Sequence, residues 1–374
     1  MGKLDQITWV NFLNDVEEAD AFNNVNNCWN LEKINEILWD HYEDERPEII
    51  KILLEQGGLL DNRTEIPDEF FQSCDNLTSI EIPEGITYIG TAAFYGCSSL
   101  KSIVIPEGVT SIETSVFAGC ENLTNISIPK GVTSIGGSAF SNCNSLTSIE
   151  IPEGVTSIGD YAFTECDNLT NITLPNTLTS IGHIAFAHCY SLTNIVIPEG
   201  VTSIGNSAFN DCRNLTTVEL PNTLTSIGKG AFEYCSSLKN IVIPEGVTSI
   251  EDETFMYCKN LINVVIPEGV TYIGGIVFND CSNLKNIVIP SSVTFINSYA
   301  FHSCKSLTSI VIPEGVKDIG YDVFENCSSL TIYCNCEANN VPAGWKKDWK
   351  KGSKKVYWKN QWKYISGVPT PIKK

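Results

Sequence analysis

The sequence predicts a repeat solenoid, in which short strands from successive units stack side by side over one continuous core, preceded by a small helical module. Two observations predict this fold. Cysteine recurs every 23 residues, and each of these cysteines follows a phenylalanine by three residues and precedes a leucine by three. The repeated cysteines are Cys74, Cys97, Cys120, Cys143, Cys166, Cys189, Cys212, Cys235, Cys258, Cys281, Cys304 and Cys327. A fixed period of this length is typical of stacked repeat architectures, and twelve repeats follow from it.

The repeat at residues 146–159 shows how a unit is expected to fold. Its sequence is Leu-Thr-Ser-Ile-Glu-Ile-Pro-Glu-Gly-Val-Thr-Ser-Ile-Gly, in which Ile149 and Ile151 alternate with polar residues, as on a short strand with one buried face. Pro152 has no N–H to donate and is predicted to end this strand. Gly159 is predicted to permit a sharp bend where the unit turns again.

The segment that closes each unit carries the pattern Ala-Phe-x-x-Cys. Phe163 and Cys166 are three residues apart, so one turn of helix or 3₁₀ helix would direct both side chains inward. One unit cannot bury its apolar face alone, whereas units stacked at about 4.8 Å share a core. This spacing lies within the disulfide range, but equivalent side chains of stacked units run parallel, so buried, reduced thiols are predicted.

The arrangement Leu-x-x-Ile-x-Ile-Pro, Ile-Gly and Ala-Phe-x-x-Cys over about residues 65–335 resembles the BspA-like leucine-rich repeats of many bacterial and some protist proteins. The resemblance implies a leucine-rich-repeat solenoid of α/β class, with short stacked strands and short helical or 3₁₀ turns. It also implies adhesin-like binding at a cell surface, the role of some members of the family. Residues 1–20 instead mix acidic with apolar residues and lack the apolar run of a signal peptide, which favours an intracellular location.

Residues 1–62 lack the repeat and are predicted to form a helical N-terminal module. Apolar residues at helical spacing are Trp9, Phe12, Leu13 and Val16, followed by Leu31, Ile34 and Leu38. Pro47 is predicted to open a third helix over residues 49–54, with Gly57 and Gly58 at its end. Two roles stay open: a cap on the first repeat, which a solenoid needs, or a separate docking or dimerisation module.

Residues 337–374 follow the predicted solenoid of residues 63–336 and combine tryptophan with lysine. The candidate binding residues of this tail are Trp345, Trp349, Lys350, Trp358 and Trp362. Lysines suit phosphate or sulfate, and aromatic faces suit bases or sugar rings, so one hypothesis is recognition of an anionic polymer such as wall polysaccharide or RNA. The alternatives are that the tryptophans close the last coil, as the family resemblance of Gly344-Trp345 and residues 356–358 implies, or that the tail docks on the acidic remainder of the chain.

Charge and motifs limit the function classes. The net charge is -20, yet residues 341–374 carry ten Lys against Asp348 alone, which leaves about −29 on residues 1–340. Nucleic acid is therefore expected as a partner only through the basic tail. No apolar run reaches the roughly 20 residues that span a bilayer, so no membrane span is predicted. No dinucleotide, phosphate-loop, zinc-protease or nucleophile-elbow motif occurs, so we predict no catalytic residue, cofactor or enzymatic activity.

No metal site is predicted either. Cys334 and Cys336 form a pair without the third and fourth ligands that zinc requires. A row of glutamates at the turn position, with Glu153 and Glu199 among them, is predicted to be solvated, with calcium as the alternative. The four histidines show no partner at a recurring offset and are expected to be scattered surface residues.

The strongest candidate surface is formed by the outward strand positions. The first outward position is a polar column, whereas the second is mixed in the early repeats and then becomes valine without interruption. The candidate partner-binding residues are Val242, Val265, Val288, Val311, Asn240, Asn263, Asn286, Lys239 and Lys285. A contiguous apolar strip on an exposed sheet marks an interaction site, although β-branched residues also suit strands without one.

The sequence therefore predicts a non-enzymatic repeat protein that binds a protein or glycan partner through its stacked sheet face. The alternative is a structural or surface protein that its basic aromatic tail anchors to a wall or an anionic polymer.

Overall fold

The computed structural model describes residues 4, 6–23, 28–352 and 355–372. Three N-terminal helices precede a β-solenoid of about 13 turns, so the predicted fold class is confirmed. The chain forms two compact units, Met1–Thr177 and Leu178–Lys374. Domain boundaries at residues 62 and 336 stay a prediction.

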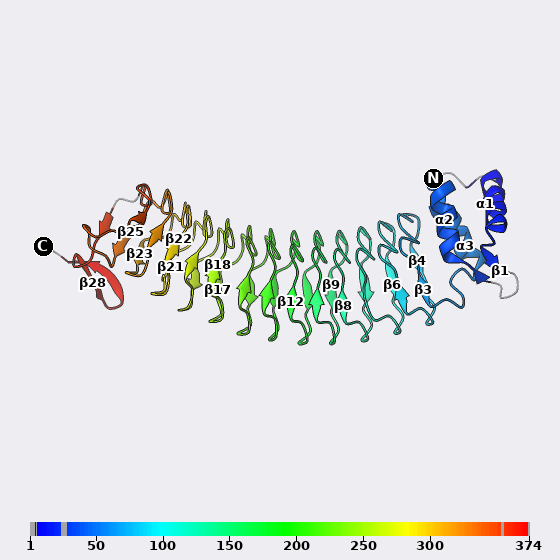
Figure 1. The fold of residues 1–374 in the computed structure, drawn as a ribbon, viewed down its shortest axis with the longest axis horizontal. Helices are drawn as coiled ribbons and strands as arrows, with labels where there is room; N and C mark the ends of the chain where they lie inside the picture. Colours follow the sequence, from blue (N-terminus) through cyan, green and yellow to red (C-terminus); the bar gives the residue numbers. More distant parts are fainter. Residues whose placement is uncertain (1–3, 5, 24–27, 353–354, 373–374) are drawn as a thin grey trace. The chain divides into compact units, whose positions relative to one another are not determined.

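The first unit begins with the helices that the apolar spacing predicts (Figure 1). They are α1 (Gln6–Glu18), α2 (Leu31–His41) and α3 (Arg46–Gln56). Phe12 and Val16 are buried on α1, Pro47 lies in the first turn of α3, and Gly57 caps its end. An antiparallel pair of strands, β1 (Phe22–Asn23) and β2 (Cys28–Trp29), lies between α1 and α2 in the chain and was not predicted.

Each coil has two short strands and a turn segment. The first strand has an outward, inward, outward pattern, as in β9 (Ser148–Glu150), where Ile149 is buried between two exposed residues. The second strand, such as β10 (Ser157–Ile158), buries one isoleucine. Equivalent strands of successive coils pair in parallel, with Asn171 opposite Ser148. The predicted alternation and the end of the strand before Pro152 are confirmed.

The strands of the first unit form two ladders. The first strands are β4 (Ser79–Ile80), β6 (Ser102–Val104), β7 (Asn125–Ser127), β9 and β11 (Asn171–Thr173). The second strands are β3 (Glu65–Ile66), β5 (Tyr88–Ile89), β8 (Ser134–Ile135) and β10, with a bridge at Ile112.

The second unit has both kinds of ladder and ends in a hairpin. Its first strands are β13 (Asn194–Val196), β15 (Thr217–Glu219), β17 (Asn240–Val242), β19 (Asn263–Val265), β21 (Asn286–Ile287), β23 (Ser309–Ile312), β25 (Thr331–Cys334) and β27 (Lys355–Tyr357). Its second strands are β12 (Ser180–Ile181), β14 (Ser203–Ile204), β16 (Ser226–Ile227), β18 (Ser249–Ile250), β20 (Tyr272–Ile273), β22 (Phe295–Ile296), β24 (Asp318–Ile319) and β26 (Gly344–Trp345). The hairpin is β28 (Trp362–Ile365) and β29 (Val368–Pro371).

The turn segment combines 3₁₀-type bonds with a third ladder. Within one segment the N–H of Ser141 donates to the Ser138 carbonyl at 3.1 Å and that of Cys143 to Phe140 at 3.2 Å, which are i to i+3 bonds. Left-handed φ values of 54° at Ser138 and 59° at Asn142 interrupt the run, so no continuous helix forms. Alternate N–H groups, those of Ser138, Phe140 and Asn142, donate at 2.8 Å each to carbonyls of the next coil instead.

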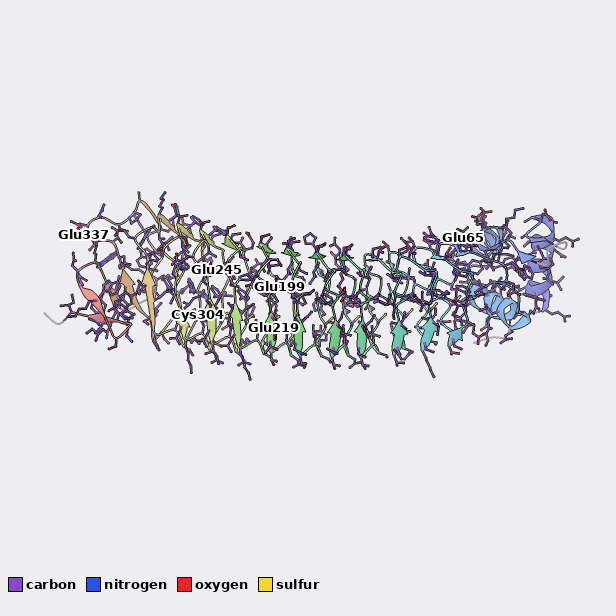
Figure 2. All side chains as sticks on the ribbon, turned by 90° about the horizontal axis from the view of Figure 1, so that it is seen from below. Glu65, Glu199, Glu219, Glu245, Cys304 and Glu337 are labelled. Carbon is purple, nitrogen blue, oxygen red and sulfur yellow. The ribbon has the colours of Figure 1, made fainter. Side chains whose placement is uncertain are left out.

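The phenylalanine and cysteine columns fill the core beneath these turns. Phe117 and Phe140 stack with ring centroids 5.6 Å apart. Cys166 donates from Sγ to the carbonyl of Phe140, 3.1 Å away in the preceding coil, and the same contact recurs along the column. The described column cysteines, Cys304 among them (Figure 2), are free thiols, and burial raises the pKa of Cys166 to about 12. Each thiol is therefore a small apolar group with one weak hydrogen bond.

The glycine after each second strand is required by close packing between coils. A Cβ on Gly159 would lie 2.6 Å from the Gly137 nitrogen, whereas one on Gly131 would meet nothing nearer than 3.6 Å. The φ of Gly159 is not in the left-handed region, so the close approach of the neighbouring coil, and not φ, requires a glycine here. The predicted bend at this position agrees with the turn segment that begins at residue 160.

Gly159→Ala is expected to lower the free energy of unfolding by about 1–3 kcal/mol, because the methyl group forces the neighbouring backbone apart. Gly131→Ala places a methyl group at ordinary contact distance and at an ordinary φ, and should change it by less than about 1 kcal/mol in either direction. Urea unfolding of both variants tests this expectation. Equal effects of the two changes would contradict it.

The helical module contacts the first coil through two side chains that replace missing backbone donors. In later coils, three turn carbonyls of a coil accept hydrogen bonds from N–H groups of the coil before it. The equivalent carbonyls of the first coil are those of Asp68, Phe70 and Gln72, and no coil precedes them. In the first coil Asn35 donates to the Asp68 carbonyl at 3.1 Å. Arg46, only 2% exposed, donates to the Phe70 and Gln72 carbonyls at 2.6 and 2.5 Å. These contacts favour the interpretation of the module as a cap.

Candidate interaction surface

The four valines of the predicted strip lie in one column of the second unit. Val242 pairs in register with Val265, and the next two coils add Val288 and Val311. The side chains of Val242, Val265 and Val288 are 63%, 54% and 77% exposed, and Val311 is partly exposed. Buried residues such as Ile241 alternate with them along the strands, so the pleat turns the valines outward.

The polar and basic candidates share this face. Asn240, Asn263 and Asn286 are exposed and adjacent in register, and the Asn263 side-chain amide donates to the Asn240 oxygen at 2.9 Å. Lys239 and Lys285 are exposed in the column beside them. The structure thus brings all nine predicted residues together on one face, and their role in binding stays a prediction.

The C-terminal hairpin forms a wall at the end of the strip. Tyr364 and Val368 of the hairpin line a hollow of about 320 Å³ together with Val288 and Val311. Tyr364 and Val368 are themselves largely exposed. The sequence analysis did not predict this hairpin, although Ser366-Gly367 between two β-branched and aromatic runs was an available signal.

The tail buries three of its four candidate tryptophans. Trp345 donates from Nε1 to the Val316 carbonyl at 3.1 Å, and Trp362 donates to the Cys334 carbonyl at 3.1 Å. Trp349 meets the ring of Phe324 edge-on. The aromatic faces of these side chains lie in the core, which favours the closing interpretation over stacking on a polymer.

The tail also adds coils to the ladders. Ile319 pairs with Trp345, and Tyr333 pairs with Tyr357, so residues without the repeat motif form a further turn of the solenoid. Trp358 is partly exposed, and Lys350 is exposed with its Nζ 5.8 and 5.6 Å from the ring centroids of Trp349 and Trp358.

Two tail lysines contact the acidic part of the second unit. Lys351 lies 3.1 Å from a Glu325 oxygen and 3.7 Å from Asp322, and Lys359 lies 3.0 Å from Glu314. The lysine side chains of these pairs are about half exposed, so solvent screens the contacts. Docking of the tail on its own acidic body, one of the predicted alternatives, is thus seen for these lysines.

The remaining charged residues form local contacts. Glu153 accepts hydrogen bonds from Asn176, and Glu199 accepts from Asn222. His188 lies 3.4 Å from Asp211 and His302 lies 3.8 Å from Glu325, in each case a carboxylate 23 residues later. The expectation of histidines without a partner at a recurring offset was therefore wrong for these two. Within the described ranges, no group of three or more His, Cys, Asp or Glu has an arrangement that could hold a metal ion. In the described part of the chain, no helix is both long and apolar enough to cross a membrane.

The same architecture occurs in solved structures of bacterial proteins. A leucine-rich repeat protein from Bacteroides ovatus ATCC 8483 is 28% identical, with 79% of this chain and 87% of that chain covered and a TM-score of 0.54. A leucine rich cell surface protein from Faecalibacterium prausnitzii A2-165 is 33% identical, with 79% and 83% covered and a TM-score of 0.52.

Curated proteins offer no match to this sequence. The model of a protein family described as "BspA type Leucine rich repeat region (6 copies)" matches residues 64–193, 134–261, 179–305 and 226–341. Together these matches span most of the chain. The 23-residue spacing, the stacked coils and these matches lead to one conclusion: the chain belongs to the BspA-type leucine-rich repeat family.

Proposed function

We propose that this protein is a non-enzymatic binding protein that contacts a protein or glycan partner through the outward face of its first-strand ladder. The observation that carries the proposal is the exposed strip Val242, Val265, Val288 and Val311. A contiguous apolar strip in water has a free-energy cost that a partner removes by covering it. Leucine-rich repeat families are usually non-catalytic, which supports the same class of function.

The strip offers both apolar and directional contacts. Covering a valine side chain contributes roughly 1.5 kcal/mol, so three largely exposed valines supply several kcal/mol of association free energy. The asparagine column beside them supplies amide donors and acceptors, and Lys239 and Lys285 select against a basic partner. A cell-surface setting is part of the proposal, because the similar Faecalibacterium protein is described as a cell surface protein.

The experiment is binding of the intact protein to a panel of immobilised matrix proteins and glycans. Changing Val242, Val265 and Val288 together to Lys is expected to weaken binding at least 10-fold, because three exposed apolar contacts become charged. The matched control is Val196→Lys, since Val196 occupies the same outward position but pairs with Glu219 instead of another valine. A triple variant that binds as tightly as the control contradicts the proposal.

The alternative is anchoring through the basic tail, which the exposed Lys350 over two indole rings favours. Truncating the tail would open the core, so the suitable variant changes Lys346, Lys347 and Lys350 to Gln. Heparin is the probe for an anionic polymer. Loss of heparin binding in this variant, with the valine variant unaffected, supports the alternative and opposes the sheet-face proposal.

A further inference from the structure

The first strand of the first unit leaves one edge open. Among the described residues β4 pairs with β6 alone, so β4 is an edge strand. Along this ladder the inward-facing residues direct their N–H and C=O toward the next coil, as Ile151 does when it donates to Thr173 at 3.0 Å. By the alternation of a strand, the backbone N–H and C=O of Ser79 and Glu81 therefore face away from β6.

The helical module supplies donors to the turn segment of this coil and leaves the edge of β4 without a pairing strand among the described residues. Asn35 and Arg46 supply donors to the turn carbonyls. No strand pairs with the other side of β4 in the described residues. Ile80 is consequently partly exposed, whereas the equivalent Ile103 of the next coil is buried.

A hollow of about 610 Å³ lies beside this edge. One wall is the side of α3 that carries Lys51, Leu54 and Glu55, and the other is formed by residues 76–81 of the first coil with residues 102–104 of the second. Its lining combines apolar side chains, with Leu54 and Ile80 among them, and the charged side chains of Lys51, Glu55 and Glu81. Unpaired backbone groups beside an apolar hollow are the features that a strand-adding peptide uses.

We propose that this edge is a docking site for an extended polypeptide segment of a partner protein, which adds as a further strand beside β4. Its main chain bonds to the N–H and C=O of Ser79 and Glu81, and one apolar side chain of the segment rests on Leu54 and Ile80. The occupant is a polypeptide because the unmet groups are backbone donors and acceptors at strand spacing. This site goes beyond the proposed sheet-face function and lies in the other unit of the chain.

The probe is a capped, fluorescent peptide that copies residues 146–152, a first strand of this protein that already pairs with its neighbour in this way. Titration into the intact protein is followed by fluorescence anisotropy, and amide hydrogen exchange of Ser79 and Glu81 is measured with and without peptide. We expect saturable binding and slowed exchange at both amides.

Ser79→Pro separates strand addition from other modes of binding. Its N–H faces away from β6, so proline removes the outward donor while the pairing of β4 with β6 remains. Peptide affinity is expected to fall at least 10-fold in this variant, with an unchanged melting temperature. A peptide carrying N-methyl groups on alternate residues is expected to lose affinity to a similar extent.

Two outcomes overturn the proposal: no saturable binding of the peptide to the intact protein, or equal affinity of the wild type and Ser79→Pro. The triple valine variant should bind the peptide normally, because its changes lie in the second unit. Failure of this site and failure of the sheet-face function are therefore distinguished by the two sets of variants.

Discussion

Arg46→Ala is expected to lower the free energy of unfolding by about 3–5 kcal/mol, because a buried charged donor is lost from a polar network. The carbonyls of Phe70 and Gln72 would lose this donor. The contact between the Arg46 guanidinium and the Trp39 ring, whose centroid lies 4.3 Å from Cζ, would be lost as well. Burial lowers the pKa of Arg46, a measure of how far its surroundings exclude water. Urea unfolding gives the magnitude, and hydrogen exchange of the Phe71 and Ser73 amides reports whether the first coil opens.

Two further variants identify the cause. Asn35→Ala removes an exposed bond to the Asp68 carbonyl and a longer bond, 3.3 Å, that the Asn35 side-chain oxygen accepts from Arg46, and should cost about 1–2 kcal/mol, less than Arg46→Ala. Arg46→Lys keeps the charge but replaces the planar group by one ammonium, which cannot bond both carbonyls in the same geometry, so an intermediate loss is expected. If Arg46→Ala were no more destabilising than Asn35→Ala, the capping interpretation would be wrong.

Alkaline pH is expected to destabilise the protein through its column of buried cysteines. Burial raises the pKa of Cys74, Cys120 and Cys166 to about 12, from an ordinary value of about 9 in an unfolded chain. Above pH 9 the folded protein therefore holds protons that the unfolded chain releases. Stability is fully present below pH 9 and is lost as the pH rises toward 12, at about 1.4 kcal/mol per pH unit for each thiol.

The expected loss between pH 8 and pH 10 is about 4 kcal/mol from these three thiols. Urea unfolding at the two pH values measures it. Cys120→Ala with Cys166→Ala lowers stability at pH 8 by removing packing, but it should also reduce the loss between pH 8 and 10 by about 3 kcal/mol. Stability that does not change over this range would show that the thiols are already accessible to water.

Local sequence patterns predict the coil well because its constraints are short in range. The alternation around Ile149 and the missing donor of Pro152 act within a few residues, so the strand and its end are visible in the sequence. The helical spacing of Phe12 and Val16 on α1 is equally local, and Gly57 ends α3 as predicted. The column of Val242 and its successors follows once the period of 23 is known.

The missed features depend on contacts between residues far apart in the chain. Trp345 continues the second-strand ladder without the repeat motif, because an indole can fill the place of an isoleucine once a preceding coil offers Ile319 as a partner. The close approach that requires Gly159 was not predicted, because Gly137 in the neighbouring coil sets it. The pairing of Arg46 with the Phe70 and Gln72 carbonyls has no sequence signature, since a helix residue meets carbonyls more than 20 residues later.

The sequence by itself determined the family, the coil and the outward position of Val242, Val265, Val288 and Val311, because a repeat imposes the same local geometry in every unit. The tertiary structure decided what happens where the repeat stops. In the tail, Trp345, Trp349 and Trp362 are buried, and the hairpin of β28 and β29 lines a hollow together with Val311. At the N-terminal end, the helical module supplies donors to the turn segment of the first coil and leaves β4 without a second pairing strand among the described residues. The physical reason is that an end coil lacks one neighbour, so its unmet hydrogen bonds and exposed apolar groups are satisfied by whichever distant residues the chain brings to it.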